Sequence, residues 1–100
     1  KHDLHLYEKP KMKLQVLLAK EILEHALAIL VVESDFSEEN MHTMIGNIAK
    51  EYGYKTGQVY TVLRVALSGV EVTPGGSAEL ADILGKEEAI RRLQFSLSLF

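Results

Sequence analysis

Apolar residues recur every three or four positions from Met12 to Val32, which predicts one long helix over that range. The stripe consists of Val16, Ala19, Leu23, Ala26, Leu27 and Leu30, and it is widened by Leu18, Ile22 and Ile29. A helix that is apolar over most of its circumference belongs at the centre of a bundle. Residues 1–11 are polar and show no clear period.

A second helix is predicted to begin after Ser37, a good N-cap, and to end at Tyr52 before Gly53. Its apolar face consists of Met41, Met44, Ile45, Ile48, Ala49 and Tyr52. Glu38 and Glu39 fall in its first turn, where the helix dipole favours acids. We interpret Glu38–Glu39 and the later pair Glu87–Glu88 as solvated acids that start helices.

Three shorter helices are predicted to follow. One runs from Thr56 to Ser68, with Gly69 at its end. The next begins either at Thr73-Pro74 or at the competing cap Ser77, and ends at Gly85. The last begins near Lys86 and buries Ala89, Ile90, Leu93 and Leu97.

No segment alternates long enough for a sheet, so the predicted fold is all-α, a compact bundle of about five helices. We expect residues 1–33 to be a polar lead-in and a connecting helix from a preceding helical subdomain. Residues 34–100 would then be the C-terminal helical subdomain. The chain begins at Lys1, and we expect it to be a piece of a longer polypeptide.

Composition excludes several classes of protein. The chain has 100 residues, of which 47% are apolar and 25% charged, so it is globular in composition. It has no cysteine, which excludes a disulfide scaffold and a thiolate zinc site and suits a cytoplasmic protein. We expect no signal peptide, and the longest apolar run, residues 26–32, is too short to span a membrane.

The sequence carries no residue set for catalysis. It lacks a glycine-rich phosphate loop between a strand and a helix, and its serines lie at caps, turns or the C-terminal tail. His2 and His5 have the spacing of a helical metal pair, but we interpret them as part of an exposed polar tail. His25 and His42 are expected on polar helix edges, in contact with water.

The helix over residues 56–68 carries a candidate nucleic-acid site. Tyr60, Arg64 and Ser68 share one row at a spacing of four residues. An aromatic ring and a guanidinium side by side suit an unstacked base, which can stack on either group and hydrogen-bond to the arginine. Two other interpretations are a surface cation–π pair with Tyr60 and an ion pair between Arg64 and Glu71.

A glycine-rich loop, residues 72–76, follows this helix directly. Thr73 supplies a hydroxyl, while Gly75 and Gly76 expose backbone amides without bulk. A nucleotide could therefore approach this loop closely.

Several motifs together resemble one known family, and their order and spacing agree with it. The motifs are Leu63-Arg64-Val65-Ala66-Leu67-Ser68-Gly69, Thr73-Pro74-Gly75, Leu84-Gly85-Lys86-Glu87-Glu88 and Arg91-Arg92-Leu93. They resemble the C-terminal anticodon-binding domain of bacterial glutamyl-tRNA synthetases, which are class I enzymes. The resemblance covers residues 34–95, while residues 12–33 look like the helix that joins the two helical subdomains of that region.

The resemblance implies a role in reading the anticodon of a glutamate tRNA. By this resemblance Arg64 and the Thr73-Pro74 loop touch the first anticodon base. We expect Arg64 to donate to a pyrimidine edge or an adjacent phosphate, Thr73 to contribute its hydroxyl or backbone, and Pro74 to pack against a base or ribose. Tyr60, Gly75 and Gly76 complete the implied site.

The resemblance also implies an upstream catalytic domain in the same polypeptide, which would use ATP and Mg²⁺. The H-I-G-H and K-M-S-K-S signatures of that domain are absent from this sequence, so the chain itself is expected to be non-catalytic and to hold no cofactor.

The sequence departs from the family pattern at three places. Val62 replaces a proline, Gln58 replaces a basic residue, and Gly75-Gly76-Ser77-Ala78 replaces a shorter and bulkier sequence.

An alternative function is a helical protein-interaction module without RNA contact.

The charge distribution bears on both functions. The formal charge is −3, and residues 1–49 carry five basic and eight acidic groups, while residues 50–100 carry six of each. The half with the motifs is therefore neutral, so phosphate neutralisation is not a large part of its role.

Overall fold

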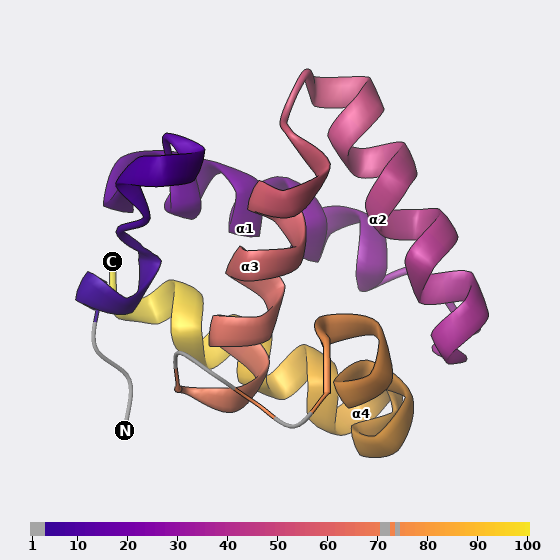
Figure 1. Cartoon of the computed structure of the whole chain (residues 1–100). Helices are drawn as coiled ribbons and strands as arrows, with labels where there is room; N and C mark the ends of the chain where they lie inside the picture. The colour runs from indigo at the N-terminus through magenta and orange to yellow at the C-terminus, as the bar shows by residue number, and fades with distance from the viewer. Residues whose placement is uncertain (1–3, 71–72, 74) are drawn as a thin grey trace.

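Helix α3, residues Thr56–Ser68, runs through the middle of the molecule between the other helices (Figure 1). The structure is a computed structural model that describes residues 4–70, 73 and 75–100. Its other helices are α1 (Val16–Leu30), α2 (Glu38–Tyr52) and α4 (Ser77–Ser98), and two 3-10 turns, η1 (Leu4–Tyr7) and η2 (Pro10–Met12), precede α1. The predicted all-α fold is confirmed.

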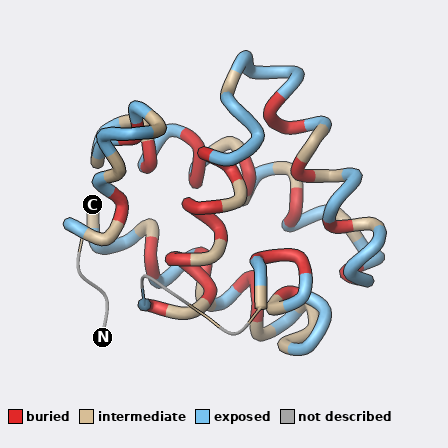
Figure 2. The backbone as a smooth tube through the Cα atoms, viewed as in Figure 1, coloured by how far each residue is buried: buried red, intermediate tan, exposed pale blue. Residues whose placement is uncertain are grey.

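Helix α3 is central because residues around most of its circumference are buried. Val59, Val62, Val65 and Ala66 have no exposed surface. Figure 2 shows this helix largely in the colour of buried residues, while α2 is buried along one side only. The difference follows from sequence, because α2 has a single apolar stripe and α3 has apolar residues at most positions.

Helix α4 contains the predicted break at Gly85. Its backbone there has φ 81° and ψ 164°, which is not helical, so α4 consists of two helical segments that meet at this residue. The start of α4 is also settled: Gly76 is the N-cap and Ser77 the first helical residue, so Thr73 lies before the helix. Pro74 lies outside the described residues.

The caps of α2 and α3 agree with prediction. The Ser37 hydroxyl accepts from the Asn40 amide at 3.3 Å and caps α2. Gly53 and Gly69, each at φ 75°, end α2 and α3 in the left-handed conformation.

The predicted start of the first helix at Met12 is wrong by four residues. Pro10 opens η2, and Lys13 follows in the left-handed region at φ 58°. The backbones of Lys9 and Leu14 then pair antiparallel. This turn occupies the residues where the helix was expected, so α1 begins only at Val16.

The lead-in is also less polar in its packing than its sequence indicates. Tyr7 is 1% exposed and Leu14 3% exposed, and both belong to the same core as α1, α2, α3 and α4. The lead-in therefore closes one side of the core.

The predicted division of the chain at residues 33 and 34 stays a prediction. Among the described helices, none is long and apolar enough to cross a bilayer.

Candidate nucleic-acid interface

Arg64 lies on α3 with part of its side chain buried. Its Nε atom is buried and has no hydrogen-bond partner in the described part of the chain. The ion pairs found there all involve other residues. Because a buried donor without a partner costs about 1–3 kcal/mol, this guanidinium is suited to a partner supplied by a ligand.

Tyr60 lies one turn before Arg64 and contacts α2. Its hydroxyl is 2.6 Å from Nδ1 of His42, and the two ring centroids are 5.7 Å apart at an interplanar angle of 49°. The aromatic partner of Tyr60 is thus His42, and the cation–π interpretation of Tyr60 with Arg64 finds no ring–cation contact among the described residues. The alternative partner Glu71 lies outside them.

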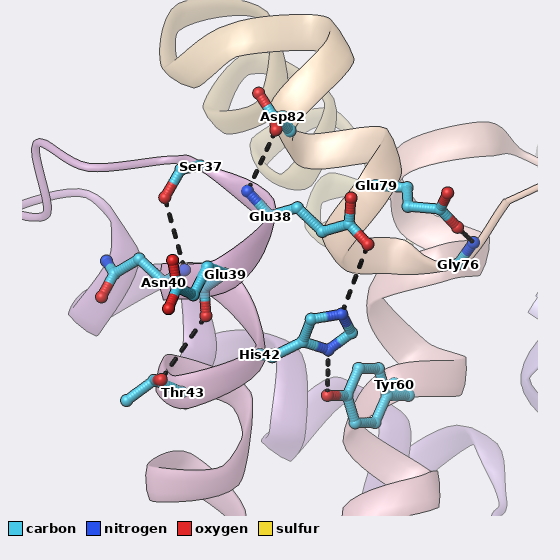
Figure 3. Close-up of polar contacts among 10 residues, drawn as sticks. All are labelled: Ser37, Glu38, Glu39, Asn40, His42, Thr43, Tyr60, Gly76, Glu79 and Asp82. Carbon is cyan, nitrogen blue, oxygen red and sulfur yellow. Dashed lines mark hydrogen bonds and ion pairs between the residues drawn. The ribbon is translucent and has the colours of Figure 1, made fainter.

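His42 connects Tyr60 to the start of α2. Its Nε2 lies 3.6 Å from a carboxylate oxygen of Glu38, and its side chain is 52% exposed. Figure 3 shows the imidazole with one nitrogen toward Glu38 and the other toward Tyr60. The predicted polar-edge position is right, but the sequence did not indicate that His42 adjoins the candidate site. The only available signal was its place on the polar side of α2.

The start of α2 also contacts α4. The Glu38 amide donates to Oδ2 of Asp82 at 3.1 Å, as Figure 3 shows. This bond brings the first turn of α2 beside the first segment of α4. Glu38, Asp82 and Glu79 are all exposed, so acids border this side of the interface.

The described part of the 73–76 loop is closed by its own hydrogen bonds. The Thr73 hydroxyl donates to the Gly75 carbonyl, and the Gly76 amide donates to Oε1 of Glu79 at 3.1 Å. A Cβ at Gly75 would lie 3.0 Å from that carboxylate oxygen, whereas a Cβ at Gly76 would meet nothing within 4 Å. A side chain at Gly75 would therefore displace the flexible end of Glu79, whereas one at Gly76 would not.

Ser68 has a local role. Its hydroxyl donates to the Arg64 carbonyl at 2.6 Å and also bonds to Val70 at the end of α3. Ser68 thus stabilises the helix end that precedes the loop.

The acids and histidines that we interpret from the sequence as non-functional have the following local contacts. Glu38 and Glu39 occupy the first turn of α2 as predicted. Glu88 instead accepts hydrogen bonds from Arg91 at 2.6 Å and from Arg92 at 2.7 Å, which lower the pKa of its carboxyl.

His5 is exposed and lies 3.0 Å from Glu8, while His2 is outside the described residues. The described part of the chain contains no cluster of three or more residues suited to a metal ion. His25 is partly buried, with its ring centroid 3.9 Å from that of Tyr52. It therefore packs against an aromatic ring, which its predicted position in water did not anticipate.

Comparison with known proteins settles the family. Residues 1–97 match the family described as anticodon binding domain. The chain belongs to this family. It is 38% identical over 96 residues to a glutamate–tRNA ligase of Clostridium acetobutylicum, and the match covers 96% of this chain and 20% of that protein.

Two further relatives give the same result. The glutamate–tRNA ligase of Clostridium tetani is 38% identical over 96% of this chain and 20% of its own length. That of Clostridium botulinum strain Eklund 17B is 38% identical over 98% of this chain and 21% of its own length. The chain therefore spans about a fifth of the length of these relatives. The predicted resemblance to the anticodon-binding domain of glutamyl-tRNA synthetases is confirmed.

Proposed function

We propose that this anticodon-binding domain reads the anticodon bases of a glutamate tRNA through the exposed side of α3 and the 73–76 loop. The observation that carries the proposal is the buried Nε of Arg64, which has no partner among the described residues. A base edge or a phosphate oxygen accepts well from a guanidinium, and Arg64 is only partly buried, so RNA would bond to the exposed part of this group.

The other residues of the proposed site have complementary roles. Tyr60 offers a ring one turn from Arg64, and Thr73 offers a lone pair of its hydroxyl, whose proton is already donated to Gly75. Gly75 and Gly76 leave the loop without side-chain bulk, so that a nucleotide can come close to its backbone. Pro74 is proposed as an apolar wall for a base or ribose. Together these groups suit splayed, single-stranded bases.

The charge balance indicates how much of the tRNA this domain holds. Residues 50–100 carry equal numbers of acidic and basic groups, so few phosphates are neutralised here. We therefore propose that this domain specifies bases while other parts of a longer cytoplasmic polypeptide bind the tRNA backbone. Its catalytic domain would use ATP and Mg²⁺ to attach glutamate, and this chain would supply no catalytic group.

The test measures binding of this chain to the anticodon stem-loop of glutamate tRNA by fluorescence anisotropy at low salt. Arg64→Ala should weaken binding by roughly 5- to 150-fold, the equivalent of about 1–3 kcal/mol for a good polar contact to a base. Arg91→Ala is the matched control, because Arg91 is exposed and paired with Glu88 on α4. Equal affinity of the Arg64→Ala variant and the parent would reject the site.

A protein-interaction module remains the second candidate because of one surface feature. A groove of about 510 Å³ is lined by Val31, Lys86, Glu87, Ile90, Arg91 and Gln94. Ile83 and Val32 are each 81% exposed. Recovery of one stable protein partner by a pull-down, with no stem-loop bound at low salt, would favour this function over RNA recognition.

A further inference from the structure

We propose that His42 and Tyr60 form a second base-stacking site, which holds an RNA base next to the one bound at Arg64. The inference rests on the proposed function and deepens it, because it extends the RNA-binding surface from α3 onto α2. Its ligand is an unpaired base of single-stranded RNA.

The first step is the geometry of the two rings. Their centroids are 5.7 Å apart and their planes are tilted by 49°, so neither ring covers the face of the other. Half of the His42 side chain is exposed, and Tyr60 is partly exposed. Rings of this kind, held at the surface, are the groups on which unstacked RNA bases pack.

The second step is that both rings are fixed in place. The Tyr60 hydroxyl is 2.6 Å from Nδ1 of His42. In the tautomer protonated at Nε2, this hydroxyl donates to Nδ1 and the Nε2–H points toward Glu38, 3.6 Å away. Because contacts on both sides restrain the imidazole, less side-chain entropy is lost when a base stacks on it.

The third step is the charge around the rings. Glu38 contacts His42 directly, and Asp82 bonds to the Glu38 amide. Glu79 is one helical turn from Asp82 on α4. Phosphate binding requires basic groups, so acids at this border favour a base over a phosphate at the rings. The RNA backbone would then run on the solvent side.

The fourth step is the distance from the first site. Tyr60 and Arg64 are four residues apart on α3, a rise of about 6 Å along the helix axis. Two neighbouring nucleotides can therefore be held at once, one at Arg64 and one at the two rings.

The experiment combines protein variants with RNA that lacks single bases. The probes are the anticodon stem-loop of glutamate tRNA and versions in which one anticodon nucleotide at a time is abasic. His42→Ala removes the ring, and His42→Phe keeps a flat ring but loses the bond to Tyr60. His5→Ala is the matched control, since His5 is an exposed histidine in η1. Thermal midpoints are measured for each variant, and binding is measured below them.

The expected result is that His42→Ala weakens binding of the intact stem-loop by roughly 5-fold or more, as the loss of one stacked base implies. His42→Phe should keep most of the affinity, and His5→Ala all of it. The effect of His42→Ala should vanish for one abasic RNA. That nucleotide should differ from the one whose removal cancels the effect of Arg64→Ala.

Three results would overturn the inference. They are unchanged affinity for His42→Ala, an equal loss for every abasic RNA, and coupling of His42 and Arg64 to the same nucleotide. A lower thermal midpoint of His42→Ala with full affinity would show that His42 only joins α2 to α3. If Arg64→Ala weakens binding and His42→Ala does not, only this inference fails. If neither does, the proposed function fails as well.

Discussion

The hydroxyl groups of Tyr7 and Ser96 share a buried hydrogen bond, although the two residues are 89 positions apart. Tyr7 is 1% exposed and Ser96 is fully buried. The Tyr7 ring also lies 5.2 Å from that of Phe100, centroid to centroid. The start of the described chain and its C-terminal end are therefore joined, as their positions in Figure 1 show.

We expect Tyr7→Phe to lower the free energy of unfolding by about 1–3 kcal/mol, because it leaves the buried Ser96 hydroxyl without its partner. Chemical denaturation measures the loss. The double variant Tyr7→Phe/Ser96→Ala removes both polar groups and should recover part of it. If the two single effects simply add, the hydrogen bond contributes nothing measurable.

The same tyrosine predicts a loss of stability in alkali. Burial raises the pKa of Tyr7 from 10 to about 12, against a smaller opposite effect of its bond to Ser96. Between these values the unfolded chain loses the phenol proton and the folded chain keeps it, so the free energy of unfolding falls as pH rises. Two pKa units correspond to about 3 kcal/mol, and below pH 10 this contribution is constant.

A control is needed because the pKa of Tyr54 is also raised, mainly by burial and next by its hydrogen bond to Glu21. The contribution of Tyr54 to the pH dependence must therefore be distinguished from that of Tyr7. Chemical denaturation is repeated at several pH values between 9 and 12. The free energy of unfolding should fall less steeply with pH for Tyr7→Phe than for the parent, and Tyr54→Phe is measured as the comparison. An unchanged slope in Tyr7→Phe would show that Tyr7 ionises alike in both states.

Helix periodicity was enough to predict α2, α3 and the two segments of α4, because each has a regular apolar stripe and a glycine or cap at its end. It failed at the lead-in, where the buried position of Tyr7 depends on Ser96 and Phe100 at the other end of the chain. No local pattern records a contact between residues so far apart in sequence.

In the candidate site, too, local spacing was predictable from the sequence, whereas contacts between different helices were not. The row of Tyr60 and Arg64 follows from helical spacing within one helix. The contact of Tyr60 with His42 depends on how α2 packs against α3, which spacing does not reveal.

Gln58 is a second residue whose role depends on contacts with another segment of the chain. Its side chain is 5% exposed, donates to the Met12 carbonyl at 2.8 Å and accepts from the Lys55 amide at 3.0 Å. The departure from a basic residue at this position thus has a structural role.

Charge on the inner face of α3 should unfold the domain. Leu67 is 3% exposed, so Leu67→Asp buries a carboxylate without a partner and should cost several kcal/mol of the free energy of unfolding. Leu17→Asp is the matched control, since Leu17 is 75% exposed. Thermal unfolding followed by circular dichroism measures both. A Leu67→Asp variant with the thermal midpoint of the parent would contradict the assignment of this face.

A conservative change at Arg64 should separate charge from geometry. Arg64→Lys keeps the positive charge but loses the planar fork and its Nε donor. If the guanidinium bonds a base edge, Arg64→Lys should lose nearly as much stem-loop affinity as Arg64→Ala, measured by fluorescence anisotropy. Full affinity in Arg64→Lys would show that only a point charge is needed and would place a phosphate at this position instead.

Gly85 is required by the backbone of α4. At φ 81° and ψ 164° it lies in a region that is essentially restricted to glycine, and no neighbouring atom within 4 Å would hinder a Cβ there. Gly85→Ala should therefore cost about 1–3 kcal/mol through backbone strain alone. Gly46→Ala is the control, because Gly46 lies within α2 and its Cβ would also meet nothing within 4 Å.

Opposite effects are expected for these two glycine-to-alanine changes in chemical denaturation. Gly46→Ala should raise the free energy of unfolding by about 0.5–1 kcal/mol, since alanine is the better helix former and restricts the unfolded chain. Gly85→Ala should lower it, because alanine cannot adopt the break without strain. If Gly85→Ala also stabilised the chain, α4 would be able to continue as one unbroken helix through this position. The two segments of α4 would then not need the bend that brings Asp82 to the start of α2.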